Sequence, residues 1–254
     1  MPALLDLQAV TMRFGGLVAV NAVSLAIESG NLYGLIGPNG AGKTTLFNVI
    51  TGVYEPTEGK VLFEGKEIAG RKPCNINGLG IARTFQNIRL FQNMTVLDNV
   101  KVAFDRKQKA GVFAGIVHSK LHHDEEARID TEARELLKIF KLEALADDRA
   151  KNLAYGLQRR LEIARAMATQ PRLLCLDEPA AGMNPQESHD LMQLIRWIRD
   201  HFGMAILLVE HNMKVVMGVC ERVHVLDYGS TIATGTPAEI QADPRVIEAY
   251  LGGA

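Results

Sequence analysis

The chain has few cysteines, and none of them has the spacing of a paired site. Cys74, Cys175 and Cys220 are odd in number, lie far apart and form no C-x-x-C. Secreted domains that depend on disulfides usually carry an even set of cysteines. The three cysteines therefore indicate a reducing compartment, and we expect them to be structural residues within the packing of the fold.

The sequence also has no excess of charge of either sign. Its 28 Lys and Arg side chains oppose 29 Asp and Glu side chains, which leaves a formal net charge of -1 at pH 7. Binding to nucleic acid or to anionic lipid usually requires a marked basic excess. We therefore expect no nucleic acid among the partners.

Long apolar runs, internal repeats and low-complexity segments are absent as well. No run approaches the roughly 18 residues of a membrane span, and the start, MPALLDLQAV, lacks the pattern of a signal peptide. The composition, 254 residues with 47% hydrophobic and 22% charged, is typical of one large globular domain. The expectation is a cytoplasmic protein whose link to a membrane comes only through a partner.

What the sequence does contain is a glycine-rich loop, LIGPNGAGKTT, between an apolar strand at 31–36 and a helix. It satisfies G-x-x-x-x-G-K-[ST], in which backbone N–H groups and the helix dipole face phosphate oxygens. Lys43 is expected to reach the β- and γ-phosphates, Thr44 to bind Mg²⁺ through its hydroxyl, and Thr45 to bond a nearer phosphate. The whole expected phosphate-binding set is Gly37, Pro38, Asn39, Gly40, Ala41, Gly42, Lys43, Thr44 and Thr45.

Two carboxylates close a second apolar stretch, RLLCLDEP at 172–179. This is the form of a buried parallel strand whose carboxyl end carries chemistry. Asp177 is expected to hold Mg²⁺ through water and Glu178 to polarise the attacking water. Acidic residues often mark nothing more than a strand end, but behind a P-loop they form a Walker B candidate.

Three further residues keep two interpretations each. His211 follows the apolar stretch 204–209 and is either a γ-phosphate sensor or an ordinary core or surface histidine. Gln86 either coordinates Mg²⁺ through its amide oxygen or is merely solvated in a loop. Phe14, beside the turn Gly15-Gly16, either stacks on an adenine ring or is a plain core residue.

The remaining pattern predicts β hairpins at both ends of the chain and helices between them. Alternation favours a hairpin over 4–27, a short strand over 60–63 and a closing hairpin over 223–233. The stretch from Thr95 to about Arg160 is helical in character, with its clearest helix over 124–142. His118, His122 and His123 could suggest a metal site, but solvated helix ends are the more common case.

Together the P-loop, Gln86, the stretch 153–160 before RLLCLDEP, and the pair Glu210-His211 resemble the ATP-binding cassette family over essentially the whole chain. The resemblance is closer still to the LivG-type, larger ATPase subunits of branched-chain amino acid importers. The segments that carry it are ARTFQNIRLFQNMTVLDNV, NLAYG with QRRLEIARAM, LDEPAAGMNP, LLVEHNMKVVMG and VIEAYLG.

This resemblance implies an α/β fold, with a RecA-like P-loop NTPase core, an antiparallel β subdomain and an inserted helical subdomain. Residues 1–254 would form one such domain, with the core and β subdomain in 1–85 and 161–254 and the helical subdomain in about 86–160. It also implies a head-to-tail dimer that encloses two ATP molecules, each between the P-loop of one subunit and the signature loop of the other.

The signature loop departs from the family's usual Leu-Ser-Gly-Gly-Gln. Ala154, Tyr155 and Leu157 replace the Ser, the first Gly and the Gln, while Leu153 and Gly156 remain. Ala and Tyr are expected of the LivG type, but Leu157 departs even from that pattern. The change bears on how this subunit completes its partner's ATP site.

The function implied by the resemblance is an ATPase that powers import of branched-chain amino acids, with ATP and Mg²⁺ as cofactors. Glu178, His211 and Gln86 would be catalytic, Thr44, Gln86 and Asp177 would serve Mg²⁺, and Phe14 would join the ATP site. The expected partners are a second ATPase subunit, in a heterodimer or a homodimer, membrane permease subunits and, indirectly, a substrate-binding protein. The protein would lie peripherally on the cytoplasmic face of the cell membrane.

Two other classes are weaker alternatives. A soluble cassette protein of translation or repair typically carries two cassettes or long inserted arms, whereas this chain has one cassette and no basic excess. A nucleotide-binding module without hydrolysis is disfavoured by the presence of Lys43, Asp177, Glu178 and His211.

Overall fold

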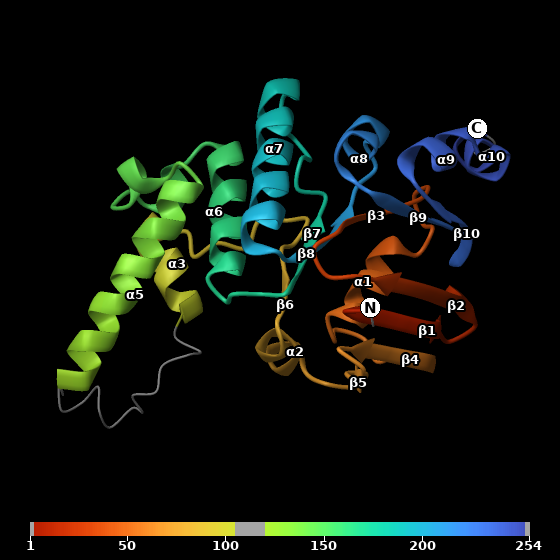
Figure 1. Ribbon diagram of the computed structural model, residues 1–254, viewed down its shortest axis with the longest axis horizontal. Coiled ribbons are helices and arrows are strands. Elements are labelled where there is room, and N and C mark those ends of the chain that lie inside the picture. The colour runs from red at the N-terminus through yellow and green to blue at the C-terminus, as the bar shows by residue number, and fades with distance from the viewer. Residues whose placement is uncertain (1–2, 105–119, 252–254) are drawn as a thin grey trace. The chain divides into compact units, whose positions relative to one another are not determined.

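The structure is a computed structural model that describes residues 3–104 and 120–251 (Figure 1). The chain divides into two compact units, residues 1–83 with 172–254, and residues 84–171. The first unit holds both β sheets, and the second is helical. This is the expected α/β organisation with an inserted helical part.

An antiparallel sheet in the first unit has the strand order β2-β1-β4-β5. Its strands are β1 (Leu5–Phe14), β2 (Leu17–Ile27), β4 (Glu58–Phe63) and β5 (Lys66–Glu67). The two-residue turn Gly15-Gly16 joins β1 to β2, whose pairing runs from Phe14↔Leu17 to Leu5↔Ile27. The hairpin that alternation predicts is confirmed.

The second sheet has the order β10-β9-β3-β8-β7-β6. Its strands are β3 (Leu32–Ile36), β6 (Ile81–Arg83), β7 (Leu173–Asp177), β8 (Ala205–Val209), β9 (Arg222–Asp227) and β10 (Ser230–Gly235). All neighbours are parallel except β9 and β10, which form the expected closing hairpin. Every residue of β3, β7 and β8 is buried, which explains why these strands are continuous apolar runs.

The described residues of the first unit form six helices. They are α1 (Lys43–Ile50), α2 (Pro73–Leu79), α7 (Pro185–Phe202), α8 (Met213–Val219), α9 (Pro237–Ala242) and α10 (Pro244–Leu251). Sequence periodicity does not predict α2 or α8, because seven residues span only two turns. By contrast, α7 has clear start signals, with Pro185 at its first position and a capping box between Asn184 and Glu187.

One apolar core joins both sheets of this unit and includes α1. Leu46, Phe47 and Ile50 of α1 are fully buried and belong to the same cluster as Ile27 of β2 and Leu207 of β8. Burial of these side chains stabilises the helix directly behind the glycine-rich loop. The loop is therefore attached to rigid elements at both of its ends.

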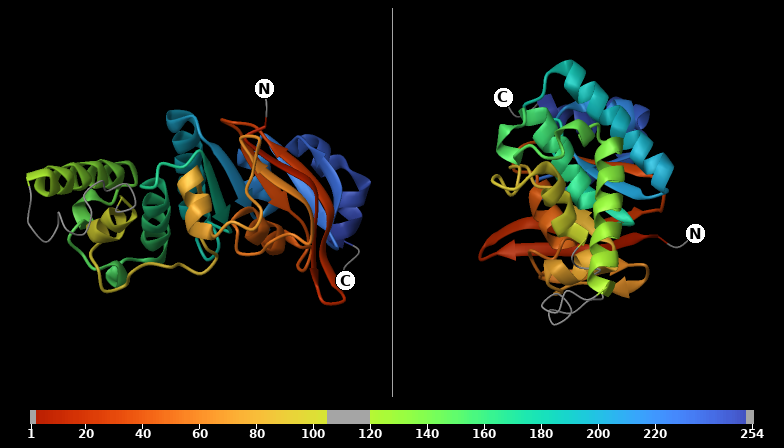
Figure 2. Two further views of the ribbon diagram at one scale, coloured as in Figure 1. Left: turned by 90° about the horizontal axis from the view of Figure 1, so that it is seen from below. Right: turned by 90° about the vertical axis from the view of Figure 1, so that its left-hand side faces the viewer.

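The part of the helical unit that the structure describes contains α3 (Val96–Phe104), α5 (Lys120–Ile139), the 3₁₀ turns η2 (Glu143–Leu145) and η3 (Ala150–Asn152), and α6 (Tyr155–Met167). Here α3 lies against α5 and α6 (Figure 2). The expected helix 124–142 is present but ends at Ile139, because Lys141 has a left-handed backbone with φ of 58°.

The limits of this unit also differ from the expected 86–160 and fall at 84 and 171. A boundary at 160 would cut α6, which is one continuous helix with Leu161, Ile163 and Ala164 fully buried. The signature stretch and the helix after it therefore belong to one folded unit.

Two of the three cysteines have the expected packing role. Cys175 and Cys220 are buried, and burial raises the pKa of each thiol to about 12. Cys74, on α2, is exposed, so that prediction is wrong for this residue. The sequence analysis predicted neither α2 nor the exposure of Cys74 on that helix.

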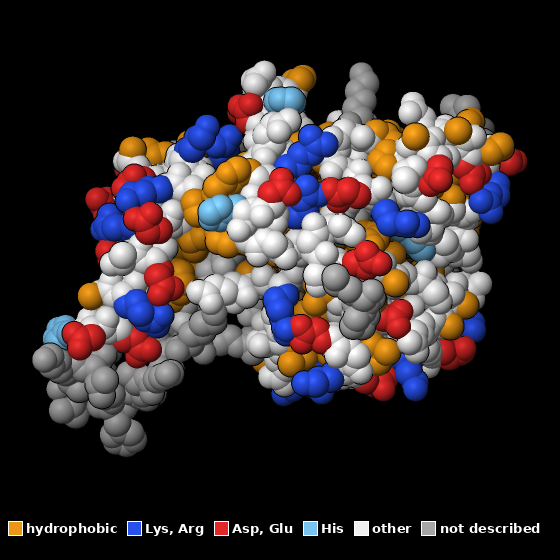
Figure 3. Space-filling view, in the orientation of Figure 1, with side chains coloured by type: hydrophobic (Ala, Val, Ile, Leu, Met, Phe, Trp, Pro, Cys, Tyr) orange, Lys and Arg blue, Asp and Glu red, His pale blue; other side chains and the backbone are white. Residues whose placement is uncertain are grey.

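The surface carries both charge signs. On the face seen in Figure 3, acidic and basic side chains are interspersed, as a net charge near zero allows. Among the described residues, no helix is both long enough and apolar enough to cross a bilayer.

Candidate nucleotide site

Three neighbouring parallel strands, β3, β8 and β7, end at the same edge of the sheet. The glycine-rich loop follows β3, Asp177 and Glu178 close β7, and Glu210 and His211 follow β8. The carboxyl edge of such a sheet is where α/β proteins bind ligands. The sequence candidates of the first unit are therefore brought together by the strand order.

The glycines at both ends of the loop are required by close backbone contacts. Gly37 and Gly42 have φ of 152° and 96°. A Cβ atom on Gly37 would overlap the carbonyl oxygen of Leu226, and one on Gly42 would overlap that of Ala19. Any side chain here would displace the loop, so the motif's glycines are explained by geometry.

Lys43 is the first residue of α1, and only 8% of it is exposed. Its Nζ donates to the carbonyl oxygens of Gly37 and Pro38, at 2.6 and 2.8 Å. Burial lowers the pKa of Lys43, and the nearby carboxylates of Glu178 and Asp177 partly oppose that shift. The ammonium group is thus held at the mouth of the loop.

The start of α1 has no side-chain cap, because its N-cap residue is Gly42. Its first N–H groups have no acceptors within the helix, and the positive end of the helix dipole is at this point. Together with Lys43 and the exposed hydroxyl of Thr44, this forms a donor set suited to phosphate oxygens and a hard cation.

Asp177 is the last residue of β7 and is 4% exposed. Its Oδ2 lies 3.3 Å from Nη2 of Arg83, the last residue of β6. The Nη1 of Arg83 donates to the side-chain oxygens of Asn48 and Thr51, at 2.6 and 2.9 Å. Arg83 therefore ties Asp177 to α1.

Sequence reasoning missed Arg83. The available signal was a single charge closing the short apolar strand Ile81–Arg83, which by itself does not indicate a partner nearly a hundred residues away.

Glu178 has an unusual backbone for a residue other than glycine, with φ of 45°. Its N–H donates to the carbonyl of Val209 at 2.9 Å, which ties the end of β7 to the end of β8. Its Oε1 lies 3.5 Å from Nδ1 of His211, whose side chain is 58% exposed. Strained backbone of this kind is often found where a side chain must be aimed at a reacting group.

Glu210 bonds to the backbone that follows Glu178, and the sequence analysis assigned Glu210 no role of its own. It is 1% exposed, and its Oε1 accepts from the N–H of Ala180 at 3.1 Å. Burial raises its pKa, and the N–H groups of Ala180 and Asn212 partly offset that effect. It holds the segment that follows Glu178.

Phe14, at the end of β1, is 41% exposed, so the interpretation as a plain core residue is wrong. Its ring makes an edge-to-face contact with Tyr54, with centroids 5.2 Å apart. An exposed, oriented ring is what stacking on a base requires. Tyr54, which orients it, was not singled out from the sequence.

In the helical unit, the backbone around Gln86 is attached to α6. Arg159, with no exposed surface, donates to the carbonyls of Phe85 and Gln86 at 2.6 and 2.8 Å. Its Nη1 also pairs with Glu162 at 2.8 Å. The Gln86 side chain itself is exposed.

The signature stretch forms the beginning of α6. Ala154 is the N-cap residue and gives no side-chain cap, while Gly156 and Leu157 lie in the first turn. Leu153 is buried, and its carbonyl accepts from Nε2 of Gln158 at 2.8 Å. Tyr155 is 44% exposed. No side chain caps this helix start, and the N–H of Leu157 donates to the carbonyl of Ala154 at 3.0 Å, which leaves the N–H groups of Tyr155 and Gly156 as the first-turn donors without an acceptor inside the helix.

Of the three neighbouring histidines, His118, His122 and His123, the structure describes the side chain of one. His123 is exposed, whereas the side chains of His118 and His122 lie outside the described residues. No group of three or more His, Cys, Asp or Glu side chains with metal-binding geometry occurs in the described part of the chain.

Two family models match this sequence. One, described as "ABC transporter", covers residues 20–181. The other, described as "Branched-chain amino acid ATP-binding cassette transporter", covers residues 230–254. The first spans the P-loop, the signature stretch and the Walker B candidate.

A curated relative and two solved structures resemble the chain over most of its length. The "High-affinity branched-chain amino acid transport ATP-binding protein LivG" of Escherichia coli K12 is 48% identical over 252 residues, which are 99% of this chain and 98% of that protein. The ADP conformation of MJ1267, an ATP-binding cassette of an ABC transporter, has a TM-score of 0.86 and 32% identity, covering 99% of this chain and 100% of that one. A dimeric bacterial ABC transporter cassette, MJ0796, has a TM-score of 0.78 and 26% identity, covering 92% and 98%.

Proposed function

This chain belongs to the ATP-binding cassette transporter family, and we propose that it is the ATPase subunit that drives an importer of branched-chain amino acids. The near full-length identity to LivG carries the choice of amino acid, together with the match of residues 230–254 to a branched-chain amino acid cassette model. The cassette hydrolyses ATP and does not itself need to contact the transported amino acid.

The observation that carries the ATPase chemistry is the convergence of three loops at one edge of the sheet. The N–H groups of the P-loop and Lys43 would bind the phosphates of ATP, and Thr44 and Asp177 would hold Mg²⁺, Asp177 through a water. A Mg²⁺ ion held by these residues would supply positive charge that offsets the negative charge developing on the transferred phosphoryl group. Gln86 is proposed to add its amide oxygen to that ion.

Glu178 is proposed to accept a proton from the water that attacks the γ-phosphate. His211, 3.5 Å from this carboxylate, is proposed to orient Glu178 and to contact the γ-phosphate as it leaves. The strained backbone of Glu178 and its bond to Val209 restrict where the carboxylate points. Phe14, oriented by Tyr54, is proposed to stack on the adenine.

We propose a dimer of cassettes, in which Leu153 to Leu157 complete the ATP site of the opposite subunit. The similarity to a cassette described as dimeric supports this arrangement. Because Ala154 and Leu157 lack the polar groups of the usual signature, the second subunit is proposed to be a different ATPase.

Permease subunits in the membrane are proposed to hold the dimer peripherally on its cytoplasmic face, with a substrate-binding protein acting indirectly. Among the described residues there is no helix that could cross a bilayer. In this proposal, the permease subunits therefore provide the attachment to the membrane.

The test is reconstitution of this chain with its permease and second ATPase in liposomes. ATP-dependent uptake of labelled leucine that is lost in Glu178→Gln would support the proposal. Co-purification with ribosomes or DNA in place of permease subunits would favour the soluble class. Uptake of an unrelated solute, with no uptake of leucine, would overturn the choice of substrate.

A further inference from the structure

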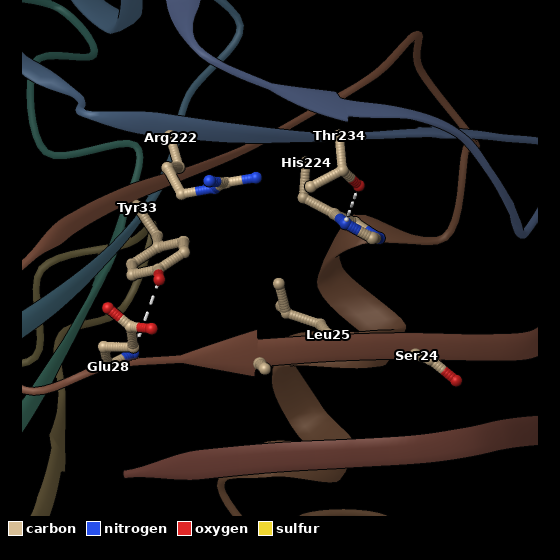
Figure 4. Close-up of a pocket in the computed structure, with 8 residues that line it drawn as sticks. Ser24, Leu25, Glu28, Tyr33, Arg222, His224 and Thr234 are labelled. Atoms are coloured by element: carbon tan, nitrogen blue, oxygen red, sulfur yellow. Dashed lines mark hydrogen bonds between the residues drawn. The ribbon is translucent and has the colours of Figure 1, made fainter. Parts of the chain in front are cut away.

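A second concave site lies in the first unit, where β2 ends and where β3, β9 and β10 pass beside it. Its volume is about 280 Å³, and its lining includes Leu25, Glu28, Tyr33, Arg222, His224 and Thr234 (Figure 4). Tyr33 is near the amino end of β3, whereas the P-loop follows the carboxyl end of that strand. None of the residues assigned to ATP above lines this pocket.

Two opposite charges stand at one side of the pocket. Arg222 reaches across the space from β9, and Glu28 stands beside Tyr33 at the end of β2 (Figure 4). The side chain of Arg222 makes no ion pair or hydrogen bond with any described residue. Its charge contributes to the lowered pKa of Glu239 on α9, whose carboxylate accepts from the N–H of Thr236. From the described part of the chain, the carboxylate of Glu28 accepts only one long hydrogen bond, of 3.4 Å, from the side-chain amide of Asn31. Both groups are therefore available to a ligand.

The opposite wall is polar but uncharged. The two ring nitrogens of His224 lie 2.9 Å from the hydroxyl of Thr231 and 2.7 Å from that of Thr234. His224 is 1% exposed, and burial lowers its pKa to about 4, so the ring is neutral near pH 7. Leu25 adds an apolar surface between the two sides (Figure 4).

A ligand that satisfies this lining needs one negative group, one positive group and a small apolar part. A dianion such as phosphate would meet Arg222 but would be repelled by Glu28. The volume equals that of about nine water molecules at ~30 Å³ each, which is room enough for one free amino acid with a small side chain.

We propose that this pocket binds an α-amino acid with an aliphatic side chain. Its carboxylate would bond the guanidinium of Arg222, its ammonium group would bond Glu28, and its side chain would contact Leu25. The choice of an aliphatic amino acid rests on the proposed function, since such an amino acid is the solute delivered to the compartment where this subunit works.

The test is calorimetry on the purified full-length chain, titrated with L-leucine. We expect one site with a dissociation constant near the millimolar range. 4-Methylpentanoate, which lacks the ammonium group, and 3-methylbutylamine, which lacks the carboxylate, should each bind at least tenfold more weakly. Inorganic phosphate should not compete.

Matched variants locate the site. Arg222→Gln and Glu28→Gln should each weaken leucine binding at least tenfold without changing the affinity for ADP, because both side chains are exposed and lie outside the nucleotide site. Arg245→Gln, which alters an exposed arginine of α10 that does not line the pocket, should leave leucine binding unchanged. Absence of leucine binding at 10 millimolar, equal affinity for 4-methylpentanoate, or unchanged affinity in both pocket variants would overturn the proposal.

The outcome separates this proposal from the proposed function. If leucine does not bind the isolated chain but is transported by the assembled importer, the pocket proposal fails and the transport function stands. If leucine binds the chain while the assembled importer carries an unrelated solute, the pocket stands and the transport function fails.

Discussion

The Nδ1 atom of His211 lies 3.5 Å from Oε1 of Glu178, although the two residues follow different strands. The contact exists because β7 and β8 are parallel neighbours in register from Leu173↔Ala205 to Asp177↔Val209. It places the imidazole ring of His211, which can orient the carboxylate of Glu178, beside the group that is proposed to activate water. The first two predictions concern this edge of the sheet.

Replacing Glu178 with Gln should keep ATP binding and lower kcat at least about a hundredfold, because the amide cannot accept the proton of the attacking water. Steady-state hydrolysis and nucleotide affinity measured on the same preparation provide the check. Glu248→Gln, which alters an exposed carboxylate of α10, is the matched control. Unchanged turnover in Glu178→Gln would remove this residue as the base.

Replacing Lys43 with Ala should abolish tight ATP binding, because the change removes the one ammonium group held against the loop by Gly37 and Pro38. Calorimetric titration with ATP and Mg²⁺ measures it, with Lys66→Ala on the exposed strand β5 as the control. An affinity equal to that of the unmodified chain would contradict the P-loop assignment.

Replacing Arg159 with Leu should destabilise the helical unit by about 3–5 kcal/mol, since it leaves Glu162 as a buried charge without its partner. Amide hydrogen exchange should also increase around Phe85 and Gln86, whose carbonyls Arg159 holds. Urea unfolding followed by exchange mapping tests both effects.

The neighbouring Arg160→Leu supplies the comparison, because Arg160 is partly exposed and should cost less than about 0.5 kcal/mol. If the two variants unfold at the same urea concentration, the buried pair is not the cause.

The buried His224 should make stability depend on pH. The pKa of His224 is about 4 in the folded chain, against 6.5 for an ordinary histidine, so the unfolded chain binds more protons between these two pH values. The contribution of the neutral His224 to the free energy of unfolding is fully present above pH 6.5. It falls by about 3 kcal/mol as the pH drops to 4.

The measurement is the free energy of unfolding at pH 7 and at pH 4.5, in the unmodified chain and in His224→Gln. The variant should lose less stability over this interval, whereas His189→Gln, at an exposed position of α7, should behave like the unmodified chain. Equal pH dependence in all three would contradict the effect of burial on His224.

The signature stretch predicts an asymmetric pair of ATP sites. Ala154 and Leu157 offer no polar side chain to a γ-phosphate, and each missing hydrogen bond to a charged group is worth about 1.5–3 kcal/mol. Hydrolysis should therefore be slow in a homodimer and rise when the second ATPase and the permease are added. Leu157→Gln should change turnover only at the site completed by this loop. Equal rates in the isolated chain and in the assembled transporter would make the asymmetry argument wrong.

The sequence by itself determined the local parts of this protein. The glycine-rich loop, the hairpin at Gly15-Gly16 and the apolar strands that end in Asp177 and Val209 are each encoded within a window of about ten residues. In such a window, backbone geometry, alternation and capping act directly. The motifs in order along the chain also carried the resemblance from which the transport function came.

Only the tertiary structure decided which distant residues meet. Arg83 joins Asp177 to α1, Glu210 holds the N–H of Ala180, and Tyr54 orients the ring of Phe14. The side chains of Glu28 and Arg222 likewise line one pocket although nearly two hundred residues separate them. Pairings of this kind depend on strand order and on how side chains fill the space between elements, and neither has a signature in local sequence.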